Sequence, residues 1–161
     1  MIPEIAVVGS DMAKQQQLMT LGWREWVSLP DLGLPHIKAK VDTGARTSAI
    51  HAFALNTYEK DGQERVEFRM HPNQKDTETV VVCDAAVIDK RVVTDSGGHK
   101  EERLVIETTL QIGRHSWSVE ATLTARDNML FRMLIGRTAM KGRAVVDPAR
   151  SYVVGSPPEA A

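Results

Sequence analysis

Residues 40–50 read Lys-Val-Asp-Thr-Gly-Ala-Arg-Thr-Ser-Ala-Ile. Apolar residues stand on both sides of the Asp-Thr-Gly triplet, so the stretch predicts a strand, a tight turn and a second strand. Gly44 permits the turn, and the Thr43 hydroxyl can anchor it by a hydrogen bond. Asp42 is then placed at a strand end, facing whatever lies opposite the turn. Taken alone, the triplet is more often an ordinary turn between strands.

The rest of the sequence predicts many short strands. Val, Ile and Thr make up 37 of the 161 residues, and such β-branched side chains pack well on a pleated sheet. Short apolar or alternating segments recur between turn signals, which is typical of a closed barrel or a sandwich. We expect strands at 23–29, 37–41, 47–53, 55–58, 65–70, 80–83, 86–93, 103–112, 116–124, 133–135, 144–146 and 152–154, and one helical turn at 137–141.

The length of 161 residues predicts one domain. We expect an N-terminal extension at 1–21, the folded domain at 22–154 and a flexible tail at 155–161. The net charge of −1 argues against nucleic acid as a direct partner. The sequence has no membrane-length apolar run and no secretory signal, so no membrane partner and a cytoplasmic location are expected. Cys83 is the only cysteine, which excludes an intramolecular disulfide and a cysteine-rich zinc site.

A second motif follows later in the chain, where residues 133–140 read Met-Leu-Ile-Gly-Arg-Thr-Ala-Met. By itself this motif predicts a core strand followed by a short helix. An Asp-Thr-Gly-Ala loop followed by two apolar residues, Gly and Arg resembles the retropepsins, which are single-lobe aspartic peptidases. The resemblance implies an all-β fold, a closed retropepsin-like barrel with one short helix after the Leu-Ile-Gly-Arg motif. It also implies that Asp42, Thr43 and Gly44 form the catalytic loop.

The chain is more similar to one bacterial family, the RimB-type proteins. The similarity rests on Gly-Trp-Arg-Glu-Trp-Val-Ser-Leu-Pro at 22–30, Ala-Lys-Val-Asp-Thr-Gly-Ala at 39–45 and Thr-Ser-Ala-Ile-His-Ala at 47–52. Later matches are Arg-Asp at 126–127, Met129, Met-Leu-Ile-Gly-Arg at 133–137 and Val-Asp-Pro at 146–148. This resemblance implies peptidase action on α-linked glutamate tails, which an ATP-grasp ligase adds to a small-subunit ribosomal protein.

The same family has also been described as ATP-dependent zinc proteases, and the residues argue against that description. The sequence has no Gly-x-x-x-x-Gly-Lys-Ser/Thr loop to bind phosphates and no His-Glu-x-x-His motif to bind zinc. His51 is expected to be a strand residue beside the site rather than a metal ligand. We therefore expect no metal and no other cofactor.

An aspartic peptidase needs two carboxylates that share a proton, because both cannot ionise cheaply at close range. A symmetric homodimer would supply Asp42 twice, and this is the expected arrangement. Three internal partners are the alternatives. Asp95 starts an Asp-Ser-Gly triplet, which fits the tip of a hairpin better than a second catalytic loop. In a retropepsin this hairpin would be the flap that closes over the substrate. Asp127 is a second candidate for the partner carboxylate. Asp147 is the third, but it precedes Pro148 as a turn residue would.

The sequence departs from the retroviral pattern at Arg46, where an Asp usually pairs with the Arg of the second motif, here Arg137. Two neighbouring guanidinium groups repel unless an anion lies between them, and a glutamate carboxylate would bind both. Segment 126–150 adds six basic and two acidic residues. We expect Ala45, Arg46, Arg137 and Arg126 to bind an acidic, oligoglutamate substrate. A module that binds acidic tails without cutting them, and a peptidase without acidic preference, are the alternatives.

Overall fold

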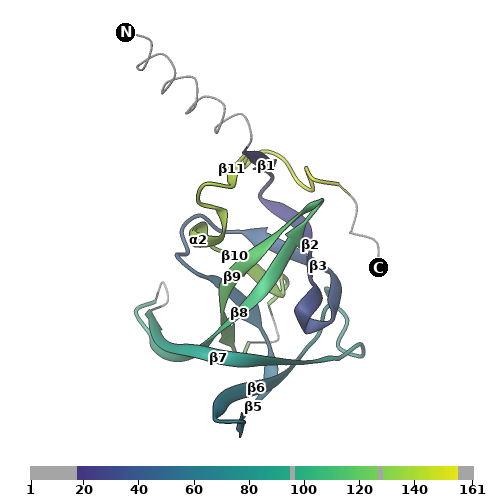
Figure 1. The fold of residues 1–161 in the computed structure, drawn as a ribbon. Coiled ribbons are helices and arrows are strands. Elements are labelled where there is room, and N and C mark those ends of the chain that lie inside the picture. The colour runs from purple at the N-terminus through teal and green to yellow at the C-terminus, as the bar shows by residue number, and fades with distance from the viewer. Residues whose placement is uncertain (1–17, 95–96, 127–128, 156–161) are drawn as a thin grey trace.

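The computed structural model describes residues 18–94, 97–126 and 129–155. They form strands, one 3-10 turn and one short α-helix, which confirms the predicted all-β class (Figure 1). The elements are β1 (Met19–Leu21), β2 (Arg24–Leu29), η1 (Pro30–Leu32), β3 (Leu34–Val41), β4 (Ser48–His51), β5 (Phe53–Lys60), β6 (Gln63–Met70), β7 (Val81–Thr94), β8 (Lys100–Ile112), β9 (His115–Thr124), β10 (Met133–Ile135), α2 (Arg137–Met140) and β11 (Ala144–Val146). No helix in this part of the chain is long and apolar enough to cross a membrane.

Nine of the strands form one sheet, in the order β2-β3-β10-β4-β9-β8-β7-β6-β5. An additional pairing of Ser28 with Gln111 joins β2 to β8. Strands β2, β3, β10, β4, β9 and β8 therefore follow one another in a closed circuit of pairings. The core is aliphatic, and its fully buried members include Leu29, Ile37, Ile50, Ile106, Leu123 and Met133.

Strands β5, β6 and β7 continue the sheet beyond this circuit and extend away from β1 and β11 (Figure 1). The sequence predicted two separate strands at 80–83 and 86–93, but they form the single strand β7. Asp84 does not interrupt β7, because Arg65 from the neighbouring strand β6 and Tyr58 from β5, the next strand along, both contact its carboxylate. The long β7 pairs with β8 up to Thr94 and Lys100, which forms the hairpin that the sequence predicted.

The two ends of the described chain meet in a small parallel sheet. Met19–Leu21 pairs with Ala144–Val146, and Figure 1 shows β1 and β11 side by side. Leu21 is fully buried, and its carbonyl accepts the Asp147 N–H at 2.8 Å. The packed structure thus includes three residues of the expected extension. The rest of that extension, at 1–17, and the tail at 156–161 lie outside the described residues.

The predicted strand at 152–154 is wrong. Tyr152 has a positive φ of 52°, which no regular strand residue adopts. The amides of Val153 and Val154 instead donate to the carboxylate of Glu25, at 3.0 and 3.1 Å. Glu25 is fully buried and also accepts the Gly22 N–H at 2.6 Å. The apolar Tyr-Val-Val pattern resembles a strand, but a buried carboxylate needs these donors and bends the backbone around itself.

Candidate active site around Asp42

The two sequence motifs lie side by side. Asp42 directly follows β3, and β3 runs parallel to β10 with Val41 opposite Ile135. The Asp42 N–H extends this pairing by donating to the Ile135 carbonyl at 2.9 Å. The structure therefore brings together the Asp-Thr-Gly loop and the segment that leads into α2, as the retropepsin resemblance implied.

The backbone of its own loop orients the Asp42 side chain. Asp42 Oδ1 accepts the N–H of Gly44 at 3.0 Å and that of Ala45 at 3.2 Å. Among the described residues, none donates to Oδ2 and none forms an ion pair with the carboxylate. The side chain is half-buried, whereas Thr43 and Gly44 are exposed. One carboxylate oxygen is thus fixed and the other can bind a water molecule or share a proton.

The start of α2 fixes this loop from the other side. The Arg137 N–H donates to the Ala45 carbonyl at 2.9 Å, and the Thr138 N–H donates to the Arg46 carbonyl at 3.1 Å. The Arg137 side chain adds a third bond, from Nη1 to the Gly44 carbonyl at 3.1 Å. Arg137 therefore has a structural role at the loop in addition to its charge.

Gly136 permits the close approach of the two segments. Its N–H donates to the buried Ser48 Oγ at 3.0 Å. A Cβ atom at this position would lie 2.5 Å from the Thr47 carbonyl carbon and 2.8 Å from the Ser48 nitrogen. Both neighbours are backbone atoms, so only glycine fits without moving the chain that follows the Asp42 loop.

Arg46 and Arg137 both lack an acidic partner within the part of the chain that the structure describes. They line two surface depressions. The first has a volume of about 820 Å³ and extends past Thr43 to the mainly apolar strand β11. The second has a volume of about 430 Å³ and lies between the Asp42 loop and strands β7 and β8. The structure thus places Arg46 and Arg137 together beside the loop, with their charges uncompensated.

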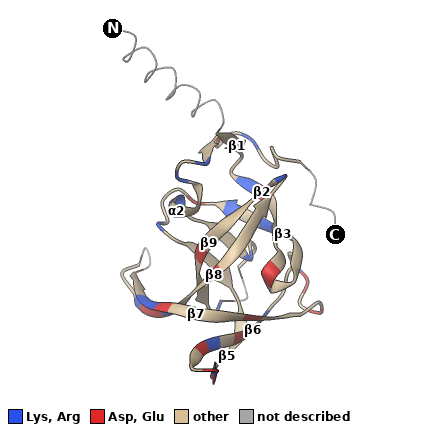
Figure 2. Cartoon of the chain, viewed as in Figure 1, with Lys and Arg blue, Asp and Glu red and all other residues tan. Residues whose placement is uncertain are grey.

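The second depression also contains two residues that the sequence analysis missed, Arg91 on β7 and Arg103 on β8. They stand directly opposite each other in the antiparallel pair. They are twelve positions apart in the sequence, in a region with many charges, and only the strand register shows that they meet. Figure 2 shows mixed basic and acidic positions along β7 and basic positions around α2.

Arg126, the fourth residue expected to bind substrate, does not line the depressions beside the Asp42 loop. It is exposed after β9. Burial and the nearby charges of Arg103, Arg126 and Arg132 lower the pKa of His51 to about 4. The His51 ring is buried, with Nδ1 2.6 Å from Thr124 Oγ1, so it is neutral at pH 7. No three His, Cys, Asp or Glu side chains gather as a metal site within 18–94, 97–126 and 129–155.

Two of the alternative partners of Asp42, Asp95 and Asp127, lie outside the described residues. Asp147 has the expected turn role, because its Oδ1 accepts the Ala149 N–H at 3.0 Å.

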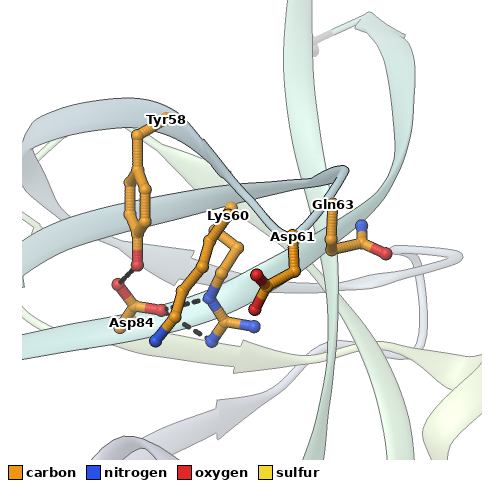
Figure 3. Close-up of a pocket in the computed structure, with 6 residues that line it drawn as sticks. Tyr58, Lys60, Asp61, Gln63 and Asp84 are labelled. Carbon is orange, nitrogen blue, oxygen red and sulfur yellow. Dashed lines mark hydrogen bonds and ion pairs between the residues drawn. The ribbon is translucent and has the colours of Figure 1, made fainter.

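A third depression, of about 610 Å³, lies on the β5–β7 part of the sheet (Figure 3). Its polar side chains contact one another: Asp84 accepts a hydrogen bond from Tyr58 and forms a 2.6 Å ion pair with Arg65. We interpret this cluster as cross-strand packing of β5, β6 and β7.

Comparison with known proteins gives one family and several relatives. The family model described as "RimB-like: Retropepsin-like aspartic endopeptidase RimB" matches residues 20–157. A probable alpha-L-glutamate ligase from Desulfotalea psychrophila is 47% identical over 148 residues, which is 92% of this chain and 31% of that protein. A probable alpha-L-glutamate ligase from Shewanella halifaxensis is 45% identical over 84% of this chain and 30% of its own length. The chain thus spans about three tenths of the length of these relatives.

A solved structure has the same fold. The crystal structure of a protein of unknown function from Legionella pneumophila superposes with a TM-score of 0.71 and covers 84% of this chain and 98% of that one. The sequence identity between the two is 24%, so this likeness concerns the fold alone.

Proposed function

The chain belongs to the RimB-like family of retropepsin-like aspartic endopeptidases, and we propose that it is an aspartic-type peptidase that cuts α-linked glutamate tails. One observation carries the proposal. The Asp42 carboxylate is oriented through Oδ1 by two backbone N–H groups, and Arg46 and Arg137 lie beside its loop without an acidic partner among the residues that the structure describes. A carboxylate held in this way can activate water, and the guanidinium groups can bind an acidic substrate.

The proposed mechanism uses two copies of Asp42 that share one proton. The ionised carboxylate takes a proton from water while the water oxygen attacks the peptide carbonyl carbon. The protonated carboxylic acid donates its proton to the carbonyl oxygen, which gives a neutral tetrahedral intermediate. The carboxyl group that took the proton from water then delivers it to the amide nitrogen as the C–N bond breaks and the amine leaves, and the other carboxylate regains its proton from the intermediate as the new carboxyl group forms. A homodimer supplies the second Asp42, and the exposure of Thr43 and Gly44 leaves the loop accessible to another copy. We propose that the closed circuit of strands is the retropepsin-like barrel that supports this loop.

Glutamate specificity is supported by charge and by the relatives. Arg46 and Arg137 can each bind a carboxylate through two nitrogens, and no described acidic residue competes for them. Relatives named as probable alpha-L-glutamate ligases contain a region similar to this chain. A ligase that forms α-linked glutamate bonds and a peptidase that breaks them act on the same polymer. We propose a functional link to such a ligase, with a glutamate-modified small-subunit ribosomal protein in the cytoplasm as substrate.

A non-catalytic module that binds acidic tails is the second candidate. It is favoured by the fact that no second carboxylate contacts Asp42 among the described residues. In both candidates the basic residues bind the acidic tail. Only the peptidase also needs Asp42 to activate water.

Mass spectrometry of an α-linked oligoglutamate peptide separates these functions. The peptide is incubated with the wild type and with Asp42→Asn, without ATP and with a chelator. We expect the wild type to shorten the peptide, and Asp42→Asn to do so at least ~100-fold more slowly, because it cannot transfer the proton. Equal shortening by both proteins would refute the role of Asp42, and binding without shortening by either would establish the binding module.

Mixing the two proteins tests the dimer. When an equal amount of Asp42→Asn exchanges subunits with a fixed amount of wild type, half of the wild-type chains enter mixed dimers that have one Asp42. The measured activity should then fall by about half. Unchanged activity after complete exchange would show that each chain acts alone.

A further inference from the structure

The second depression has the composition of a subsite for anions. Four guanidinium groups line it, and none of the described residues that line it is an Asp or a Glu. We call it the arginine pocket and define it by Arg46, Arg91, Arg103 and Arg137. Its floor follows one row of the sheet, where Leu134, Ala49 and Thr122 stand opposite one another on β10, β4 and β9. The pocket therefore has a rigid floor next to the Asp42 loop.

The pocket concentrates like charges at a cost to the fold. Arg91 and Arg103 are direct cross-strand neighbours on β7 and β8, and like charges in this position destabilise a sheet. Arg46 and Arg137 face them from the loop and from α2. An anion in the pocket would offset this repulsion.

Arg91 already has acidic partners. Its Nε pairs with Asp89 at 2.8 Å and its Nη2 pairs with Glu120 at 2.7 Å. These two bonds occupy two of its three nitrogens and compensate its charge. The Arg91 side chain is 37% exposed, so water reaches it as well.

Arg103 differs from Arg91 both in its acidic contacts and in its exposure. Its only carboxylate contact in the described chain is a long one, from Nε to Glu101 at 3.3 Å. Neither of its terminal nitrogens donates to a described residue. The side chain is only 13% exposed, but its terminal nitrogens are not among the fully buried polar atoms that lack a hydrogen-bond partner. They are therefore accessible from the pocket, and a guanidinium group with one long contact can bind a further anion through them. The positive charge at this end of the pocket also helps to keep His51 neutral.

We propose that Arg103 is a specificity-determining residue, whose two terminal nitrogens bind the side-chain carboxylate of a substrate glutamate across the arginine pocket from Arg46 and Arg137. This inference rests on the proposed function, because it assumes an acidic peptide as the ligand. The planar guanidinium group matches a carboxylate with two parallel hydrogen bonds. Arg91 contributes charge to the rim, while its nitrogens remain bound to Asp89 and Glu120.

Calorimetric titration with α-linked pentaglutamate tests the proposal, in an Asp42→Asn background that prevents hydrolysis. We expect Arg103→Gln to weaken binding by roughly tenfold or more, the loss typical of a hydrogen bond between charged groups. Arg91→Gln is the matched control inside the pocket, with the same loss of charge and an expected loss below about threefold. Arg114→Gln, on the exposed turn between β8 and β9, should bind as the background protein does.

The outcomes divide clearly. Unchanged binding by Arg103→Gln, equal losses for Arg103→Gln and Arg91→Gln, or no binding of pentaglutamate would each overturn the proposal. Arg103→Lys keeps the charge and loses the planar geometry, so its affinity should lie between those of the background and Arg103→Gln. If Arg103→Gln does not fold, Arg103→Lys is the variant that tests the proposal. Equal affinities of a folded Arg103→Lys and the background protein would overturn the hydrogen-bonding role.

The failure of this inference is distinguishable from that of the proposed function. If the wild type binds pentaglutamate through Arg103 but does not hydrolyse it, the role of the pocket is supported and the peptidase function is refuted. If the wild type and Arg103→Gln hydrolyse pentaglutamate with the same KM, the peptidase function is supported and the role of the pocket is refuted. Neither the wild type nor Arg103→Gln should bind a pentaglutamine peptide, because its side chains carry no carboxylate.

Discussion

Gly136→Ala should damage the candidate site by moving backbone rather than by removing a functional group. The new Cβ would lie 2.5 Å from the Thr47 carbonyl carbon, about 0.9 Å closer than the 3.4 Å at which ordinary contact begins. Because its neighbours are backbone atoms, the chain at Thr47 and Ser48 must shift. Overpacking of this kind typically costs 1–3 kcal/mol, and we expect about 3 kcal/mol here.

The shift should reach Asp42 through the bonds that tie its loop to α2. A displacement near 1 Å at a catalytic group can cost about 100-fold in rate. The free energy of unfolding is measured by urea titration, and peptide shortening is measured under conditions in which more than nine tenths of the protein is folded. We expect the folded Gly136→Ala protein to lose about 100-fold in kcat.

Gly113→Ala, on the turn between β8 and β9, is the control. Its Cβ would lie 2.6 Å from Val154 Cγ1, and its φ of 59° disfavours a residue other than glycine. It should also lower the free energy of unfolding and leave the kcat of the folded protein unchanged, since Gly113 lines neither depression at the Asp42 loop. Normal kcat in Gly136→Ala, or an equal loss in both variants, would refute the reasoning that the contact of Gly136 with Thr47 positions the loop.

Two further predictions concern stability. The pKa of His51 is lowered to about 4 by burial and by arginine charges, so the folded state favours the neutral ring. The neutral His51 ring therefore contributes fully to the free energy of unfolding above the unfolded pKa of 6.5. As the pH falls to 4, this contribution is lost, and the free energy of unfolding drops by roughly 3 kcal/mol. Urea titrations at both pH values should show this loss in the wild type and not in His51→Gln. Glu25→Gln should lower the free energy of unfolding by about 2–3 kcal/mol, because its NH₂ group replaces one carboxylate oxygen and cannot accept there, which leaves either Val154 or the pair Gly22 and Val153 without an acceptor. A change below about 0.5 kcal/mol in the same titration would contradict this assignment.

Much of the architecture was predictable because local patterns and tertiary structure agree. Alternating or apolar segments between turn residues gave most strands of the main sheet, and the residues after Gly136 formed the expected helix. The two motifs lie together because parallel pairing of β3 with β10 places Val41 beside Ile135. The resemblance to retropepsins, rather than periodicity, predicted that arrangement.

The remaining features depend on contacts between distant residues. A three-residue strand such as β1 has no periodicity, so its pairing with β11 could not be read from Met19–Leu21 alone. The segment at 152–154 looks like a strand until the buried Glu25 carboxylate is known. The arginine pocket depends on register, since Arg91 and Arg103 meet only if the β7–β8 hairpin pairs as it does.

The pairing of β1 with β11 has a consequence for biosynthesis. Met19 and Ala144 are 125 residues apart, so a ribosome that adds 5–20 residues per second makes the partner of β1 roughly 6–25 s after β1 itself. During that interval Leu21, fully buried in the final structure, has no complete core to enter. Contacts of such long sequence separation also form slowly, because the intervening loop must first lose entropy. Joining of the two ends is therefore a late event of folding, and a nascent chain that stalls before residue 144 leaves an apolar edge for chaperones to protect.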